Sequence, residues 1–241
     1  MVEASVSELT AVSFHRAAVE TSQAHAVYSI VFQQIGAGTN CAGTWRMSIK
    51  RVWNRYVSRR RVALAYDMAR EIARYTRQGA RVLDIGCGSG FIAYHLGAML
   101  HGPVQGTDVG PTTLAPIPYS RFSGRQLPFS DQTFDVVLFC YVLHHAQDAE
   151  VLLAEARRVL SPSGRVVIYE DTPRALLDRF FCWRHERQWV NRTGLCTFRP
   201  DAQWKQLFST LGFRLLSSRA LSRFRDLLHP VSRSFYVLGK S

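Results

Sequence analysis

The chain has 241 residues, of which 47% are hydrophobic and 20% are charged. This length and composition suit one globular domain with a substantial core, and they exclude a disordered, collagen-like or coiled-coil chain. Thirty lysines and arginines against eighteen aspartates and glutamates give a formal net charge of +12, which favours acidic partners such as nucleic acid, phosphorylated metabolites or anionic lipids, although solubility alone would explain it.

Residues 1–46 differ from the rest of the chain because they are small, polar and weakly patterned. We interpret them as a loose N-terminal extension, and we hypothesise that the natural start is Met47. Residues 47–241 are then expected to form a single domain.

The sequence also indicates in which compartment of the cell the protein is expected. The longest near-apolar run, 24–35, is shorter than the roughly 20 residues that a membrane-spanning helix needs. Glu3 and Glu8 precede the first basic residue, so the start lacks the positive region of a secretory signal. The five cysteines are irregularly spaced without a C-x-x-C pair, which predicts reduced thiols and no zinc knuckle. We therefore expect a cytoplasmic protein.

Helices and strands alternate from residue 62 onward. Apolar residues recur at helical spacing from Val62 to Tyr75, and Gly79 is expected to end that helix. The other expected elements, in chain order, are the strand 81–85, a helix with Ile92, Leu96, Met99 and Leu100, the strands 104–108 and 135–139, a helix capped by Asp148, a turn at 161–164, the strand 165–170, a helix from the cap Asp201 to Gly212, and the strands 213–218 and 235–238. This alternation predicts a doubly wound α/β sheet.

The strongest local motif is Val-Leu-Asp-Ile-Gly-Cys-Gly-Ser-Gly at 82–90, a glycine turn between a strand and a helix. Such a turn lets a ligand approach the backbone. The dinucleotide fingerprint G-x-G-x-x-G would need glycine at Phe91, so a less anionic nucleoside is favoured over a pyrophosphate. Asp108 closes the second strand, where a carboxylate can accept both hydroxyls of a ribose and would repel a 2′-phosphate.

With these motifs, the sequence resembles the class I S-adenosylmethionine-dependent methyltransferases, particularly the small-molecule group called type 11. The matching segments are 82–90, 106–111, 127–137, 142–145 and 160–165, within a resemblance that covers about 62–171. The resemblance implies a Rossmann-like, doubly wound, mostly parallel seven-stranded sheet with helices on both faces. It implies S-adenosylmethionine as the cofactor.

The resemblance also implies roles for individual residues. Gly86, Gly88 and Gly90 would pass under the methionine and ribose, and Asp84 would hold the loop or the amino group. The other implied cofactor-binding residues are Cys87 in the turn, Asp108 at the ribose hydroxyls, Val109 on the adenine, Gly124 and Arg125 at the adenine edge, and Cys140 near the methionine.

The sequence departs from the family pattern at two places. The family often has an acid where Ser123 stands, so adenine recognition is expected to rest more on the backbone. Pro111, Pro116 and Pro118 exclude the helix usually found between Asp108 and Tyr119, which predicts an abbreviated sheet edge.

Methyl transfer from a sulfonium is an in-line displacement, for which positioning and desolvation supply much of the acceleration. If the acceptor is a hydroxyl, a base helps. The candidate bases are His144, His145 and Glu170, which follow predicted strands at the carboxyl edge, although such a histidine often only caps or packs a helix.

The acceptor is expected to contact residues 172–200, a connection long enough to be a substrate lid. It holds Phe180, Phe181, Trp183 and Trp189 beside several arginines, so we predict an anionic, aromatic or lipid-like small molecule, unless the phenylalanines are core and the arginines only solvated. The basic run from Arg46 to Arg61 is typical of peripheral membrane contact or of a helix packed on its own sheet.

Other interpretations remain open. Cys182, His185 and Cys196 lack an evident fourth ligand, so no metal site is predicted. The positive charge also suits an RNA or protein methyltransferase, which is not favoured because no RNA-binding module is recognisable. A third class is a non-catalytic S-adenosylmethionine-binding protein, and the glycine spacing counts against a nicotinamide-dependent reductase.

Overall fold

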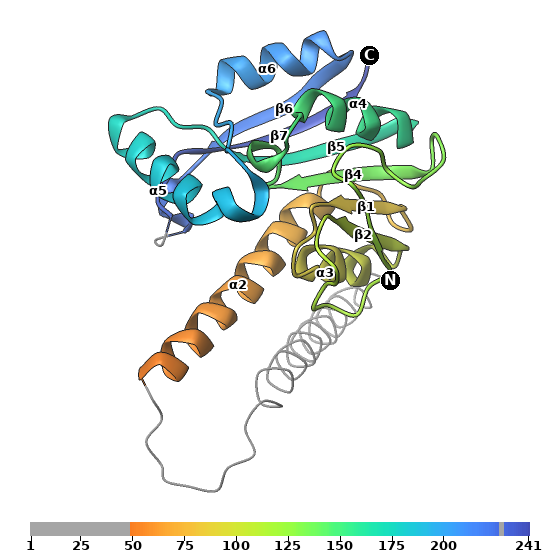
Figure 1. Cartoon of the computed structure of the whole chain (residues 1–241). Helices are drawn as coiled ribbons and strands as arrows, with labels where there is room; N and C mark the ends of the chain where they lie inside the picture. The colour runs from red at the N-terminus through yellow and green to blue at the C-terminus, as the bar shows by residue number, and fades with distance from the viewer. Residues whose placement is uncertain (1–48, 227–228) are drawn as a thin grey trace, which may run out of the picture. The chain divides into compact units, whose positions relative to one another are not determined.

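The computed structural model of the chain describes residues 49–226 and 229–241 (Figure 1). The hypothetical extension 1–46 and the start at Met47 lie outside these residues. The elements are α2 (Ile49–Ala73), β1 (Val82–Ile85), α3 (Phe91–Leu100), β2 (Val104–Asp108), β3 (Tyr119–Arg121), β4 (Phe134–Cys140), η1 (Leu143–His145), α4 (Ala149–Val159), β5 (Leu160–Asp171), α5 (Leu176–Thr193), α6 (Asp201–Thr210), β6 (Phe213–Leu221), η2 (Arg223–Arg225) and β7 (Arg233–Lys240).

Residues 66–241 form one compact unit, and every contact described below lies within it. None of the helices in the described part of the chain is both long and apolar enough to cross a membrane.

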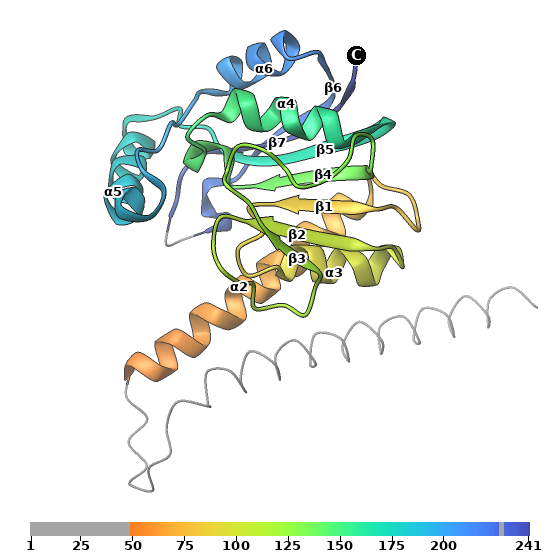
Figure 2. The same ribbon diagram turned by 45° about the vertical axis from the view of Figure 1, so that its right-hand side comes forward.

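A seven-stranded sheet forms the centre of this unit, in the order β3-β2-β1-β4-β5-β7-β6 (Figure 2). Strands β1 to β5 pair in parallel, and β7 runs antiparallel to β5 and β6. This confirms the predicted mostly parallel, Rossmann-like sheet. The strand order reverses between β1 and β4, and open α/β sheets bind ligands at the carboxyl ends of the strands beside such a point.

Alternating strand residues fill the two faces of the sheet. On one face, a single core cluster joins strand residues to α4 and α6, including Leu83 and Phe139 from the strands, Leu152 from α4, and Trp204 and Phe208 from α6. The opposite face carries Val104 of β2, against which α3 packs so closely that a Cβ on Gly97 would lie 2.8 Å from the valine side chain. Helices therefore cover both faces, as predicted.

The abbreviated edge of the sheet is confirmed. β3 has three residues and pairs only with β2, and the segment between Asp108 and Tyr119 contains no helix, because its prolines lack the N–H that a helix interior requires. The predicted strand 104–108 has the bounds of β2, and Asp148 caps α4 by accepting hydrogen bonds from the N–H groups of Glu150 and Val151.

Three details were wrong. The predicted turn at 161–164 lies inside β5, as an irregularity between the pairs Phe134–Leu160 and Val136–Arg165. Asp201 is the first residue of α6 and not its cap, since Pro200 occupies the N-cap position; the Asp201 carboxylate accepts a hydrogen bond from the Tyr236 hydroxyl. The helix predicted over 62–75 is the end of the longer α2, which stops at Ala73.

The connection 172–200 is mostly a helix. α5 begins where the buried carboxylate of Asp178 accepts hydrogen bonds from the N–H groups of Arg174 (2.8 Å) and Ala175 (3.0 Å). These are donors that the first turn of a helix leaves free. Figures 1 and 2 both show α5 beyond the carboxyl-terminal ends of the parallel strands.

Candidate active site

The glycine turn after β1 needs its three glycines. Gly86, Gly88 and Gly90 have φ angles of 68°, 52° and 76°, a left-handed region that strains other residues. A Cβ on Gly86 would lie 2.5 Å from a methyl group of Val142, and one on Gly90 would lie 2.5 Å from the Thr113 hydroxyl. A Cβ on Gly88 would meet nothing within 4 Å, so open space lies above the middle of the turn.

Asp108 ties this turn to the end of β2. Its carboxylate accepts hydrogen bonds from the N–H of Gly88 (2.9 Å) and from the N–H of Gly110 (3.2 Å). The N–H groups of Gly86 and Cys87 donate to the Thr107 carbonyl. The acid assigned to the ribose hydroxyls therefore borders the glycine assigned to the backbone under the ribose.

Asp84, on β1, is a buried carboxyl group that lacks the hydrogen-bond donors usually found around such a group. It is 1% exposed, and neither oxygen has a hydrogen-bond partner of normal geometry within the described residues. Burial, followed by the negative charge of Asp108, raises the pKa of Asp84 to about 7, and the nearby backbone N–H of Ala93 lowers it only in part. A bound cation would favour the ionised form of this group.

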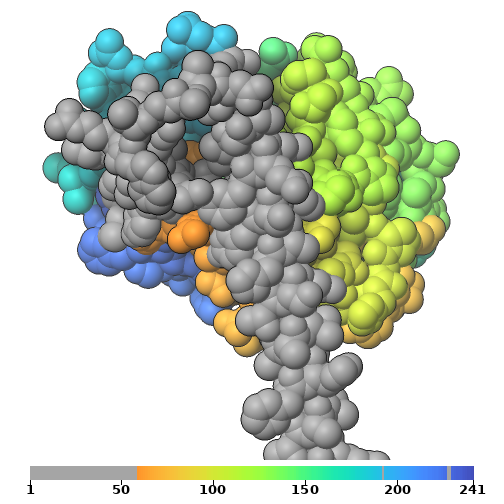
Figure 3. Space-filling view, turned by 90° about the horizontal axis from the view of Figure 1, so that it is seen from below, coloured from red at the N-terminus to blue at the C-terminus, as the bar shows by residue number. Residues whose placement is uncertain are grey.

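The remaining predicted cofactor residues lie around the same sheet edge. Val109 is 46% exposed although it is apolar, and a Cβ on Gly124 would touch it at 3.4 Å. Arg125 is exposed, and Cys140 ends β4 half-buried, with its thiol pKa raised by burial. Cys87 is half-buried beneath Gly106, where burial also raises its pKa. Figure 3 shows the yellow-to-green chain around residues 100–130 as one side of the surface.

These features fit S-adenosylmethionine. The open space over Gly88 admits a ligand close to the backbone, and the two carboxylates favour a cationic ligand with hydroxyl groups over a polyphosphate. Exposed Val109 offers an apolar surface for a base. The roles of individual residues stay predictions.

A second group of side chains lies past the ends of β4 and β5. His144 is 1% exposed, and its Nδ1 contacts the fully buried carboxylate of Glu170. Burial disfavours the charged imidazole, but the attraction and hydrogen bond of Glu170 prevail and raise the pKa of His144. Glu170 also accepts hydrogen bonds from the N–H groups of His144 (3.3 Å) and Asp171 (2.8 Å), so this carboxylate is already engaged.

His145 and His185 meet beside this pair. Their Nε2 atoms are 3.0 Å apart, and His185 comes from the middle of α5. Burial, together with the neighbouring imidazoles, lowers the pKa of His145 to about 3 and that of His185 to about 4, so both are neutral at pH 7. As a metal ligand, His185 was considered from the sequence with the thiols of Cys182 and Cys196; the structure groups it with His144 and His145, and Cys196 Sγ lies 3.3 Å from His145 Nδ1.

The buried carboxylate of Asp171 lies near these histidines. It accepts hydrogen bonds from Arg233 Nε and His229 Nε2, each at 2.9 Å. Burial would raise the pKa of Asp171, but the His229 hydrogen bond and the surrounding positive charge lower it to about 2. Sequence reasoning missed His229 and Arg233, because no local motif connects β7 to the ends of β4 and β5.

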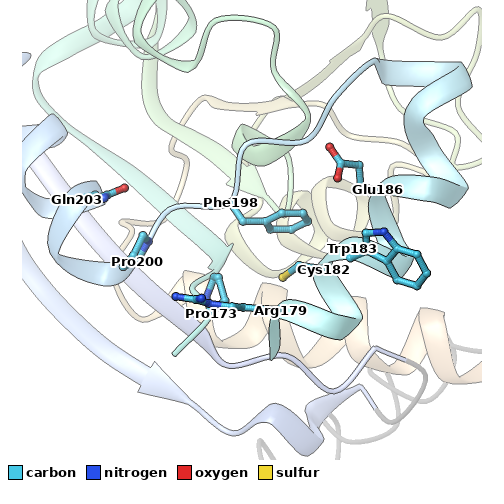
Figure 4. A pocket seen from close by; sticks show the side chains of 8 residues that line it. All are labelled: Pro173, Arg179, Cys182, Trp183, Glu186, Phe198, Pro200 and Gln203. Atoms are coloured by element: carbon cyan, nitrogen blue, oxygen red, sulfur yellow. The ribbon is translucent and has the colours of Figure 1, made fainter. Parts of the chain in front are cut away.

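A pocket of about 410 Å³ lies between α5 and the segment leading to α6. Figure 4 shows Arg179, Cys182, Trp183 and Glu186 on the α5 side, facing Phe198 across the opening. Phe198 also stacks on His144, with ring centroids 4.8 Å apart and 20° between the ring planes. The predicted lid therefore lines a pocket, and it also brings His185 and Phe198 to the histidine group.

Much of α5 remains apolar and exposed. Leu176 is 81% exposed, and Leu177, Phe180 and Trp183 are each at least half exposed. The alternative that Phe180 is a core residue is therefore wrong. The guanidinium of Arg187 lies 5.1 Å from the Trp183 ring centroid, so charge borders the apolar surface.

Comparisons with known proteins agree with this geometry. The family model described as a methyltransferase domain, type 11, matches residues 83–168. The ubiquinone/menaquinone biosynthesis C-methyltransferase UbiE of Desulfotalea psychrophila is 37% identical over 110 residues, covering 39% of this chain and 43% of that protein. A ubiquinone biosynthesis O-methyltransferase of Rhizobium rhizogenes is 28% identical over 128 residues, or 48% of this chain and 51% of that protein.

Solved structures share the fold. The methyltransferase of Haloferax volcanii solved with the Trm112 activator has a TM-score of 0.59 at 18% identity, over 75% of this chain and 90% of that one. An S-adenosylmethionine-dependent methyltransferase of Methanosarcina mazei has a TM-score of 0.57 at 17% identity, over 70% and 96%. The chain spans less than two thirds of the length of the curated relatives it matches. Residues 83–168 therefore match the type 11 family of methyltransferase domains.

Proposed function

We propose that this chain transfers a methyl group from S-adenosylmethionine to a small-molecule acceptor bound at the carboxyl edge of the sheet. The observation that carries the proposal is the glycine turn, whose middle residue has open space above it and a carboxylate from the next strand on its N–H. The cytoplasmic location expected from the sequence stays a prediction.

Three residues at the carboxyl edge of the sheet have separate roles in binding the cofactor. Gly88 lets the cofactor lie against the backbone, Asp108 binds the ribose hydroxyls, and Asp84 balances the cationic end. The bound cofactor supplies an electrophilic methyl group. The protein aligns the acceptor for an in-line attack and keeps water away, which needs no dedicated base. Glu170 is engaged by His144 and by backbone N–H groups, so it orients the imidazole and does not take the acceptor proton itself.

We further propose that the acceptor is an aromatic or lipid-like molecule that enters beside α5. The exposed apolar side chains of α5, the arginine over Trp183, and the pocket edged by Trp183 and Phe198 support this class. The relatives named for ubiquinone and menaquinone biosynthesis suggest the same class.

The cofactor part of the proposal has a matched test. Gly88→Ala and Gly79→Ala both place a methyl group at a left-handed residue, φ 52° and 71°, where nothing lies within 4 Å. Each should cost about 1 kcal/mol of stability. Only Gly88→Ala should weaken S-adenosylmethionine binding, by at least tenfold in calorimetric titration. Equal affinities in the two variants would contradict the proposed cofactor site.

The acceptor part is tested by transfer of a labelled methyl group to candidate quinone precursors, other lipids and water-soluble phenols. Trp183→Ala should raise the KM for an apolar acceptor and leave cofactor affinity unchanged, because the side chain lines a pocket to which no residue of the glycine turn contributes. An unchanged KM, or transfer only to RNA or protein, would reject this acceptor class.

A further inference from the structure

Three imidazoles converge at the end of the sheet. One ring nitrogen from each of His144, His145 and His185 lies within 4.8 Å of the other two. The first two follow β4 in the turn η1, and the third comes from α5, so the group joins two elements that are 40 residues apart in the chain. Within the part of the chain that the structure describes, these three histidines are the group of side chains whose ligand atoms lie close enough together to share a metal ion.

The outer nitrogens of two rings are held by neighbours. The Glu170 carboxylate contacts His144 Nδ1, so in the neutral imidazole that a metal ion requires, Nδ1 carries the proton and Nε2 carries the lone pair. His145 Nδ1 lies 3.1 Å from the Thr193 hydroxyl. A carboxylate behind an imidazole, as Glu170 is behind His144, is a usual second partner of a metal-binding histidine, because it fixes the ring and its tautomer.

One nitrogen of the group is left without a partner. His144 Nε2 is buried and makes no hydrogen bond within the described residues. The contact between His145 Nε2 and His185 Nε2 satisfies at most those two atoms. Buried polar atoms almost always have partners, so His144 Nε2 points to a ligand.

The spacing suits a tetrahedral ion. Bonds of about 2.05 Å at the tetrahedral angle place ligand nitrogens about 3.3 Å apart. The 3.0 Å contact is close to this value, and because no separation in the group exceeds 4.8 Å, side-chain movements of about 1 Å close the rest. The His229 ring lies beside His185, with centroids 4.7 Å apart, but its Nε2 hydrogen-bonds to Asp171 and is not a fourth ligand.

We propose that His144, His145 and His185 bind a divalent first-row transition-metal ion of the Zn²⁺ type, with one coordination position left open. Imidazole nitrogens suit this class of ion, and three protein ligands with an open position are typical of zinc sites that bind a further molecule. This inference stands apart from the methyl-transfer proposal, since it concerns binding of an ion by the free protein.

The test uses the full chain without an affinity tag, freed of metal by a chelator and titrated with Co²⁺. We expect one ion per chain and a visible absorption of tetrahedral Co²⁺, which Zn²⁺ then displaces. His185→Gln and His145→Gln should each weaken binding at least tenfold, and Glu170→Gln should weaken it by a factor of about 10 to 100. His101→Asn is the matched control, because His101 is exposed, has a φ of 47° that asparagine tolerates, and lies outside the group.

Thermal unfolding of each variant without metal shows whether the fold is retained, and the two histidine-to-glutamine variants provide independent tests. Substoichiometric binding to the wild type would overturn the proposal. So would Co²⁺ affinity that is equal in wild type, His145→Gln and His185→Gln. Neither result depends on turnover, so a failed metal site and a failed methyltransferase assay are distinguishable.

Discussion

Replacing Asp84 by asparagine should move stability and cofactor binding in opposite directions. The carboxyl group is almost completely buried, and its pKa rises from 3.8 to about 7. In the unfolded chain it ionises near pH 4, whereas in the folded protein it stays protonated until about pH 7. Folding is therefore opposed progressively as the pH rises from about 4 to about 7, and the loss then levels off.

The size of the effect follows from the shift. One pKa unit corresponds to 1.36 kcal/mol, so the ionised Asp84 costs on the order of 4 kcal/mol above pH 7. An asparagine side chain at this position cannot ionise and has nearly the same shape. The free energy of unfolding of Asp84→Asn, relative to the wild type, should therefore increase by about 2 to 3 kcal/mol between pH 5 and pH 8.

Urea denaturation at pH 5, 6, 7 and 8, followed by tryptophan fluorescence, measures this difference. Calorimetric titration of the same variant should show S-adenosylmethionine binding weakened at least tenfold at pH 7.5, because the cationic cofactor loses its buried negative partner. A stability difference that does not change with pH would refute the raised pKa. Full affinity in the variant would show that Asp84 only braces the turn.

Three further substitutions test other parts of the structure. Asp108→Ala should lower cofactor affinity at least tenfold while the circular dichroism spectrum is unchanged, and unaltered affinity would remove the ribose assignment. Gly86→Ala should destabilise the fold by about 2 to 3 kcal/mol in urea, well beyond Gly79→Ala, because the new methyl group would lie 2.5 Å from Val142. Arg81 lowers the pKa of Asp135 to about 2, so that pair stabilises the fold above pH 4 and the contribution is lost between pH 4 and 2. Asp135→Asn should cost about 1 kcal/mol at pH 7 and almost nothing at pH 2; a pH-independent cost would contradict this.

The sheet was predictable because its signals are local. The strand 104–108 and the cap Asp148 follow from residues adjacent in the sequence, and short apolar runs between turn residues fix the parallel strands. α5 was not predictable in the same way. Its apolar side chains Leu176, Phe180 and Trp183 face solvent, so the segment lacks the buried stripe by which an amphipathic helix is recognised.

The histidine group shows why the site itself was only partly predictable. In a strand, successive side chains point to opposite faces, and in a helix they diverge by about 100°, so adjacent His144 and His145 are not expected to act together. In η1 their ring centroids lie 4.2 Å apart. The third member, His185, lies on α5, a helix that the sequence did not predict. Phe198 stacks on His144 and also lines the pocket, so it connects the histidine group with the pocket. The packing of α5 against η1 thus decides both which imidazoles meet and where an acceptor would lie, which makes this contact the place where substrate recognition and the proposed ion would influence each other.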